Sequence, residues 1–179
     1  MRIAIDMDEV LADPISKFVS RYNQDYNVPL DLTMEPGYEF FHHIPENINH
    51  KWYDYINEAG FFRDLPLIEG SVEAVKKLQE EHDVYIVSAA TEFRNSLVDK
   101  YDWLSEHFPF ISWKNIVFCG NKIIKADVLI DDRIKNFVDF DGRKLLFTSP
   151  HNLLVTDYER VDNWQQVLEK IQQQPAAKL

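Results

Sequence analysis

The stretch that most constrains the fold is the first expected strand and the turn that ends it, residues 3–13. The apolar run Ile3-Ala4-Ile5 breaks directly into the acidic turn Asp6-Met7-Asp8. This pattern is typical of a buried strand of a parallel sheet that delivers carboxylates to the sheet edge. Ligands of open α/β sheets bind beyond the carboxyl ends of the strands, so we expect Asp6 and Asp8 to face one small volume. The alternative is that both acids are ordinary solvated loop residues.

Composition restricts the class of protein. A chain of 179 residues with 45% hydrophobic and 27% charged residues is typical of a soluble protein of one domain, or one domain with a small insertion. The net charge of -11 disfavours a nucleic-acid polymer as partner, although a small phosphorylated ligand fits if a metal ion and a lysine mask the local field. Cys119 is the single cysteine, and the amino terminus resembles neither a signal peptide nor a membrane span. We therefore expect a cytoplasmic protein that does not bind membranes.

Residues 14–68 do not follow a strand-helix rhythm. Asp13 and Pro14 are a helix start, with the acid as N-cap and the proline at the first helical position. Breaks at Val28-Pro29, Glu35-Pro36-Gly37 and Ile44-Pro45 follow, and a second helix is expected over 49–59. We interpret 14–68 as a mostly helical cap inserted after the first strand, above a core formed by 1–13 and 69–179.

The rhythm of strands and helices resumes at residue 69. Short apolar strands are predicted near 84–87, 116–118, 128–130 and 145–147. Ser71 is expected to cap the helix before the first of these, and a later helix is expected to bury one face that contains Leu97, Tyr101, Leu104 and Phe108. Strands separated by helices imply parallel pairing with right-handed crossovers. The predicted fold is therefore α/β and Rossmann-like, with helices on both faces of the sheet.

Each of the first four predicted strands ends in a polar or charged group. Asp6 and Asp8 follow the first strand, Ser88 the second, Lys122 the third, and Asp131-Asp132 the fourth. Singly, each has an ordinary interpretation as a cap, turn or solvated charge. Because the carboxyl ends of parallel strands meet at one edge, their coincidence predicts a shared site.

This set of residue types is suited to phosphoryl transfer. Asp6 is best placed as the nucleophile, which would form an aspartyl-phosphate, and Asp8 as the acid and base that serves the leaving oxygen and then water. A carboxylate attacks an anionic phosphate only with nearby cations, so we expect Mg²⁺ at Asp6, Asp131 and the Asp8 backbone, and the ammonium of Lys122 beside it. The Ser88 hydroxyl and the backbone N–H groups from Ala89 onward are expected to bind phosphate oxygens.

The motifs resemble those of haloacid dehalogenase-type phosphatases. The resemblance lies in four stretches: Asp6-Met7-Asp8-x-Val10-Leu11-Ala12-Asp13, Ser88, Lys122, and Ala126-Asp127-x-Leu129-Ile130-Asp131-Asp132-Arg133. It is strongest to the 5'(3')-deoxyribonucleotidase branch and extends through Glu58-Ala59-Gly60-Phe61-Phe62, Pro150-His151-Asn152 and Asp162-Asn163-Trp164. It implies a HAD-like core, a small helical cap, Mg²⁺ dependence, dephosphorylation of deoxyribonucleoside monophosphates, and members that can pair as homodimers.

Four features depart from that family pattern, and one of them is Pro14, which stands where the family often has an aromatic residue that touches the substrate pocket. Glu9 stands where the family usually has glycine, and Ser88-Ala89 stands where threonine-serine is frequent. The spacing between Lys122 and Asp131 is one residue shorter than expected, which leaves Lys125 as a rival for the phosphate-site lysine.

Aromatic residues of the insertion are candidates for binding a base or deoxyribose. The set is Tyr38, Phe40, Phe41, Phe61 and Phe62, and each is alternatively part of the insertion's own core. Tyr38 matches the family's base-stacking position.

Three other functions remain open. A receiver-type signalling domain also gathers acids, a hydroxyl and a lysine at one sheet edge, but its acceptor aspartate follows a middle strand. A phosphatase of the same kind could act on a sugar phosphate or another small phosphomonoester. A catalytically silent binding protein is the third.

Overall fold

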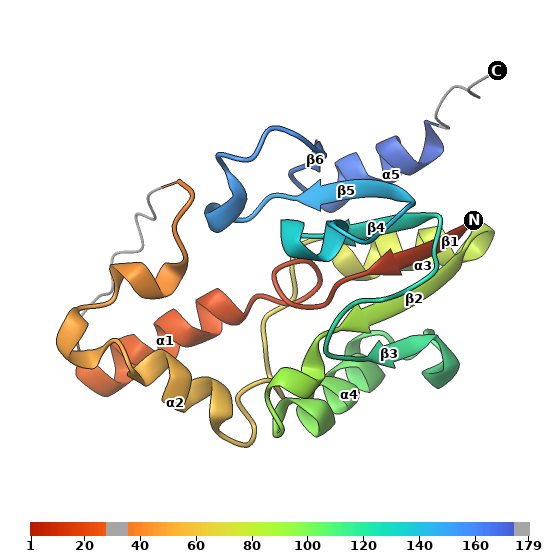
Figure 1. Ribbon diagram of the computed structural model, residues 1–179. Helices are drawn as coiled ribbons and strands as arrows, with labels where there is room; N and C mark the ends of the chain where they lie inside the picture. The colour runs from red at the N-terminus through yellow and green to blue at the C-terminus, as the bar shows by residue number, and fades with distance from the viewer. Residues whose placement is uncertain (28–35, 174–179) are drawn as a thin grey trace.

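Six parallel strands form one sheet in the order β3-β2-β1-β4-β5-β6, seen in the computed structural model, which describes residues 1–27 and 36–173 (Figure 1). The strands are β1 (Arg2–Ile5), β2 (Asp83–Ser88), β3 (Ile116–Phe118), β4 (Val128–Asp131), β5 (Arg143–Phe147) and β6 (Glu159–Val161). Ile3 of β1 pairs with Val84 on one side and with Val128 on the other. The predicted parallel α/β fold is confirmed, and β6 is an additional strand that was not predicted.

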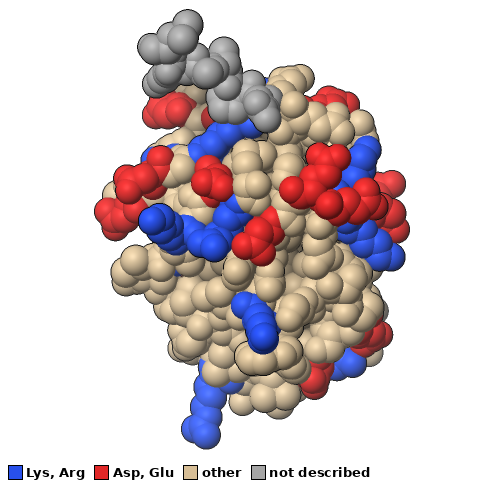
Figure 2. Space-filling model, turned by 90° about the vertical axis from the view of Figure 1, so that its right-hand side faces the viewer, with Lys and Arg blue, Asp and Glu red and all other residues tan. Residues whose placement is uncertain are grey.

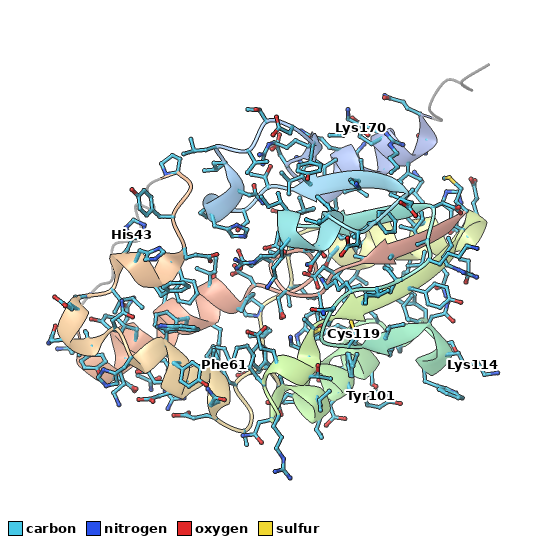
Figure 3. All side chains as sticks on the ribbon, in the orientation of Figure 1. His43, Phe61, Tyr101, Lys114, Cys119 and Lys170 are labelled. Atoms are coloured by element: carbon cyan, nitrogen blue, oxygen red, sulfur yellow. The ribbon has the colours of Figure 1, made fainter. Side chains whose placement is uncertain are left out.

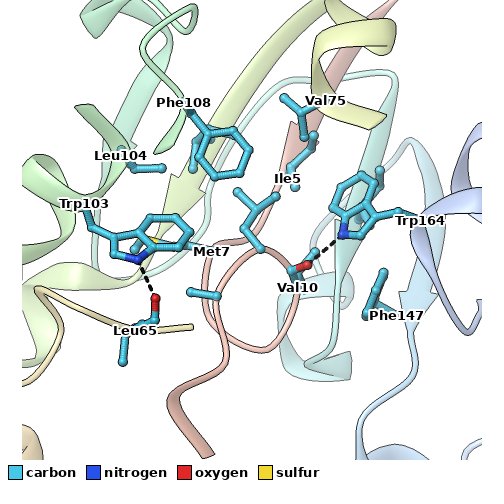
Figure 4. Close-up of a cluster of buried hydrophobic side chains, with 14 of the residues drawn as sticks. Ile5, Met7, Val10, Leu65, Val75, Trp103, Leu104, Phe108, Phe147 and Trp164 are labelled. Atoms are coloured by element: carbon cyan, nitrogen blue, oxygen red, sulfur yellow. Dashed lines mark hydrogen bonds between the residues drawn. The ribbon is translucent and has the colours of Figure 1, made fainter. Parts of the chain in front are cut away.

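Three α-helices contribute the main hydrophobic core on one face of this sheet. They are α3 (Ser71–Glu81), α4 (Ser96–His107) and α5 (Trp164–Gln172). Two buried tryptophans fasten helices to the turns around the site, as Figure 4 shows: Trp103 Nε1 donates to the Leu65 carbonyl at 2.8 Å, and Trp164 Nε1 to the Val10 carbonyl at 2.9 Å. The acidic turn thereby rests on a buried apolar base.

The opposite face has a smaller apolar cluster. Alternation along the strands sends Ala4 and Leu129 to this side, while their neighbours face the helices. Phe137 and Phe140 cover them from the short helix η5 (Ile134–Phe137) and the residues after it. Three other short helices of the core are η3 (Ala90–Glu92), η4 (Trp113–Asn115) and η6 (Pro150–Asn152).

The described part of the insertion, residues 14–27 and 36–68, lies beyond the carboxyl ends of the strands, on the left of Figure 1. Their helices are α1 (Pro14–Tyr26), η1 (Phe40–His43), η2 (Glu46–Ile48) and α2 (Lys51–Asn57). The chain leaves and returns side by side, because Asp13 N donates to the Pro66 carbonyl and Ile68 N to the Leu11 carbonyl, each at 2.8 Å. The expected break at Val28-Pro29 lies outside the described residues.

Three local expectations can be compared with the structure. Asp13 is the N-cap of α1, and its carboxylate accepts a hydrogen bond from Ser16 N at 2.9 Å, as predicted. Ser71 is not a cap; Gly70 occupies the N-cap position at φ 78°, a conformation that suits glycine. Tyr101 is not buried but 45% exposed, at the outer side of α4 (Figure 3).

The charged surface is mixed. On the face shown in Figure 2, acidic and basic side chains lie interspersed and form no field of one sign. Within residues 1–27 and 36–173, no helix is both long and apolar enough to cross a membrane.

Candidate active site

A buried triangle of two carboxylates and one ammonium lies at the carboxyl edge of the sheet. Lys122 Nζ is 2.6 Å from Asp6 Oδ1 and 2.7 Å from Asp131 Oδ2. Asp131 is the last residue of β4, whereas Asp6 and Lys122 come after β1 and β3, so the parallel sheet brings all three to one edge. Lys125, the rival lysine, is exposed on the loop after β3, and its carbonyl accepts a hydrogen bond from Arg2.

Burial changes the acid-base properties of this triangle. Desolvation raises the pKa of Asp6 to about 7, and the charges of Asp131 and Asp8 act in the same direction against the ammonium of Lys122. Burial lowers the pKa of Lys122, but the two carboxylates outweigh it and hold that pKa above its ordinary value. Lys122 is therefore a permanent cation beside the carboxylate that we expect to attack phosphorus.

Asp131 is oriented by several further donors. Asn136 Nδ2 lies 2.9 Å from both of its carboxylate oxygens, and Arg133 N donates to Oδ1 at 2.8 Å. Asp6, Asp131 and Asp132 each offer a carboxylate oxygen, and these oxygens all lie within 4.8 Å of one another. Because Mg²⁺ prefers oxygen ligands and carboxylates in particular, this donor set fits the expected cation. Asp132 is thus a further candidate ligand beside Asp6 and Asp131, the two carboxylates that the sequence assigns to the cation.

Asp8 and Ser88 come together through a residue that the sequence analysis missed. Lys100 of α4 is 2% exposed, and its Nζ lies 2.5 Å from Asp8 Oδ2 and 3.2 Å from Ser88 Oγ. A charged residue on the otherwise buried face of an amphipathic helix was the signal available. We had instead assigned Tyr101 to that face, one position away.

A second group of charged residues, which the sequence did not predict either, surrounds Glu9. Arg133 forms ion pairs with Glu9 at 3.1 Å and with Glu39, and Ser149 Oγ donates a hydrogen bond to Glu9. Glu9 has φ 58°, in the left-handed region that favours glycine, at the position where the resembling family usually has glycine. These contacts hold a non-glycine residue in that conformation and connect residues 14–68 with the core.

Asp132 and His151 complete this polar region. His151 Nε2 lies 2.8 Å from Asp132 Oδ2. Desolvation raises the pKa of Asp132 well above its ordinary value, with the charges of Glu9 and Asp6 adding to the effect. Desolvation and the nearby Arg133 lower the pKa of His151 to about 4, so the imidazole is neutral at pH 7.

A cavity of about 860 Å³ opens between the sheet edge and residues 14–68. Its lining combines catalytic candidates with an aromatic wall: Asp6, Asp8, Ala89, Lys122, Phe40, Phe41, Trp52, Phe61 and Phe62 all contribute. The rings of Phe41 and Trp52 are stacked, with centroids 4.8 Å apart and planes 15° apart. Tyr38 does not line the cavity; it is 50% exposed, and its ring contacts those of His42 and His43.

Solved structures with this architecture define the class of fold. The haloacid dehalogenase-like protein ATU0790 from Agrobacterium tumefaciens is similar with a TM-score of 0.57 and 16% identity, covering 96% of this chain and 97% of that one. The HAD hydrolase YfnB from Bacillus subtilis, solved with bound magnesium, gives a TM-score of 0.58 and 16% identity over 95% and 97% of the two chains. The fold is thus that of the haloacid dehalogenase-like hydrolases.

Sequence comparison narrows the class to a family. Residues 1–177 match the family model described as 5' nucleotidase, deoxy (pyrimidine), cytosolic type C protein. The 5'(3')-deoxyribonucleotidases of Bacillus subtilis and of Bacillus phage SPbeta are each 41% identical over 174 residues, which is 94% of this chain and 97% of theirs. The chain therefore belongs to the 5'(3')-deoxyribonucleotidase family and is a hydrolase, as its motifs predict.

Proposed function

We propose that this enzyme hydrolyses deoxyribonucleoside 5'(3')-monophosphates to nucleoside and phosphate through an aspartyl-phosphate on Asp6. The observation that carries the proposal is the buried contact of Lys122 with both Asp6 and Asp131, since Lys122 and Asp6 line the cavity and Asp131 lies directly behind them. The names of the similar Bacillus and phage proteins support the substrate class.

The chemistry divides between two aspartates. A carboxylate oxygen of Asp6 forms a bond to phosphorus while the bond from phosphorus to the ester oxygen breaks, and Asp8 gives its proton to that oxygen. In the second step a water molecule attacks the same phosphorus and gives a proton to Asp8, which frees phosphate and restores Asp6. Lys122 offsets the charge of the phosphate oxygens, and Ala89, whose backbone N–H we expect to bind those oxygens, lines the same cavity.

Mg²⁺ is the cofactor that the donor set fits. Asp6 and Asp131 would hold it, with the Asp8 backbone as expected from the sequence and Asp132 close by. When bound, it would neutralise negative charge on the phosphoryl group.

Residues 14–68 act as a cap that selects the substrate. The stacked Phe41 and Trp52, with Phe40 beside them, face the cavity and offer a surface for a base or deoxyribose. This assignment replaces Tyr38 as the leading stacking residue. The single cysteine, Cys119, is unpaired, which supports a reducing compartment such as the cytoplasm.

Asp6→Asn tests the function directly. We expect phosphate release from dUMP and dTMP in the presence of Mg²⁺ to fall by more than about 10³-fold, because the amide cannot attack phosphorus. Asp141→Asn, which changes an exposed acid, is the matched control and is expected to retain full activity.

The substrate panel should also include ribonucleotides, sugar phosphates and p-nitrophenyl phosphate. A preference for sugar phosphates would contradict the proposed substrate. A protein that labels itself once and does not turn over p-nitrophenyl phosphate would instead be a receiver-like domain, and unchanged activity in Asp6→Asn would refute the nucleophile.

A further inference from the structure

Lys100 is a buried cation that the proposed chemistry does not yet use. Its Nζ lies 2.5 Å from Asp8 Oδ2, 3.2 Å from Ser88 Oγ and 4.6 Å from the centre of the Phe62 ring. Removing an ammonium from water is strongly unfavourable unless partners replace its hydration. Both of its polar partners follow different strands and are residues singled out for the reaction. The lysine therefore connects the acid-base candidate with a phosphate-site candidate.

The two oxygens of Asp8 have different surroundings. Oδ2 is held by Lys100, whereas Oδ1 is buried and has no hydrogen-bond partner among the described residues. Asp8 also lines the cavity but does not belong to the close group of Asp6, Asp131 and Asp132. Among the described residues, Lys100 is therefore the donor that holds this carboxylate in place.

We propose that Lys100 is a positioning residue that fixes the carboxylate of Asp8 beside the cavity, in place for proton transfer to the leaving oxygen of the substrate. The proposal rests on the function proposed above. An ammonium can donate a hydrogen bond to Oδ2 whether or not Oδ1 carries a proton, and the bond is stronger when the carboxylate is ionised. The same contact thus orients Asp8 when its proton passes to the ester oxygen and when it later accepts a proton from water, while Lys100 itself is unchanged.

Lys100→Met tests this role, because methionine keeps most of the side-chain volume and removes the ammonium. We expect kcat for dUMP to fall by about 10- to 100-fold, the range for a misplaced catalytic group, while KM changes by less than about threefold. The fall in kcat should be smaller for p-nitrophenyl phosphate, because p-nitrophenolate leaves without needing a proton. Lys77→Met, at an exposed position of α3, is the matched control and should change kcat and KM for neither substrate.

A double-mutant cycle separates action through Asp8 from direct action on phosphate. If Lys100 works through Asp8, the double variant Asp8→Asn with Lys100→Met should be no slower than Asp8→Asn alone. Additive losses, a large rise in KM, or equal losses for both substrates would overturn the proposal.

Thermal unfolding of each variant guards against a folding defect. Should Lys100→Met not fold, Lys100→Arg retains a charged donor, and the same cycle and leaving-group comparison apply to it. With Lys100→Arg, a smaller loss for p-nitrophenyl phosphate than for dUMP supports the role, and equal losses overturn it. Failure of the proposed function is recognised separately, since Asp6→Asn would then remain active whatever the Lys100 variants do.

Discussion

Lys122 and Lys125 lie only three positions apart on one loop, yet only Lys122 is placed to bind phosphate. Lys122 is enclosed between two carboxylates, whereas Lys125 is exposed on the same loop. Replacing Lys122 would leave Asp6 and Asp131 facing each other without a cation. The ammonium therefore matters for the stability of the metal-free fold as well as for the reaction.

Lys122→Met is expected to reduce both the stability of the metal-free fold and the catalytic rate. Turnover of dUMP should fall by about 10²-fold or more, and the free energy of unfolding without Mg²⁺ by about 3 kcal/mol, because one partner of a buried ion-pair network is lost. Urea unfolding and steady-state kinetics measure the two effects. Lys125→Met should change the stability by less than about 0.5 kcal/mol. Similar losses in both variants would contradict the assignment.

Site residues at strand ends could be predicted from the sequence, whereas those that depend on packing could not. Asp6, Lys122 and Asp131 each follow an apolar strand, and the parallel sheet brings them together. Lys100 enters the site only because α4 turns its face to the sheet, and the expected burial of Tyr101 concealed it. Helical spacing alone does not distinguish the two adjacent faces when aromatic and aliphatic residues occur on both.

At the scale of elements, one arginine joins the last two strands to the last helix. Arg143 of β5 forms a two-fold contact with the Glu159 carboxylate of β6, at 2.7 and 2.8 Å. It also donates to the Lys170 carbonyl near the end of α5 at 2.7 Å. β6 escaped prediction because its three residues, Glu159–Val161, have no apolar run, and its position depends on these distant partners.

Glu159→Gln should weaken this connection in a pH-dependent way. The hydrogen bond from Arg143 lowers the pKa of Glu159 below its ordinary value of 4.5. The stabilisation is therefore fully present above that value and is lost as the pH falls through the lowered pKa. Because Glu159 is partly exposed, we expect a loss of about 1 kcal/mol or less at pH 7.

Urea unfolding at pH 7 and at successively lower pH values measures the effect. The difference between Glu159→Gln and the unchanged protein should shrink below pH 4.5. Glu80→Gln, at an exposed position of α3, should differ at neither pH. A difference that grows on acidification would contradict the role of the ionised carboxylate.

At the scale of the whole molecule, the rhythm of apolar strands and helices was enough to predict the parallel α/β architecture. The insertion over 14–68 was predicted from its repeated proline breaks, and the structure has its helices beyond the carboxyl edge of the sheet. The position of Tyr38 outside the cavity lining could not be predicted, because it depends on how the insertion packs on the core.

Mg²⁺ should stabilise the entire fold, because a ligand that binds only the native state raises the free energy of unfolding. At about 100 times its dissociation constant the gain is about 2.7 kcal/mol, and at roughly 2–4 °C per kcal/mol the melting temperature should rise by roughly 5–10 °C. Calorimetry with and without Mg²⁺ measures the shift. It should disappear in Asp131→Asn and persist in Asp141→Asn, and persistence in both would exclude Asp131 as a ligand.

The central place of β1 has a consequence for how the protein is made. Its two neighbours begin at Asp83 and Val128, so β1 is synthesised before either strand with which it pairs. At about 5–20 residues per second, Val128 is synthesised roughly 6–25 s after β1, and until then β1 lacks its neighbour on that side. The aspartate that we expect to attack phosphorus is thus synthesised well before Asp131, the acid with which it shares Lys122. A nascent chain stalled before Val128 would contain Asp6 but would still lack Asp131.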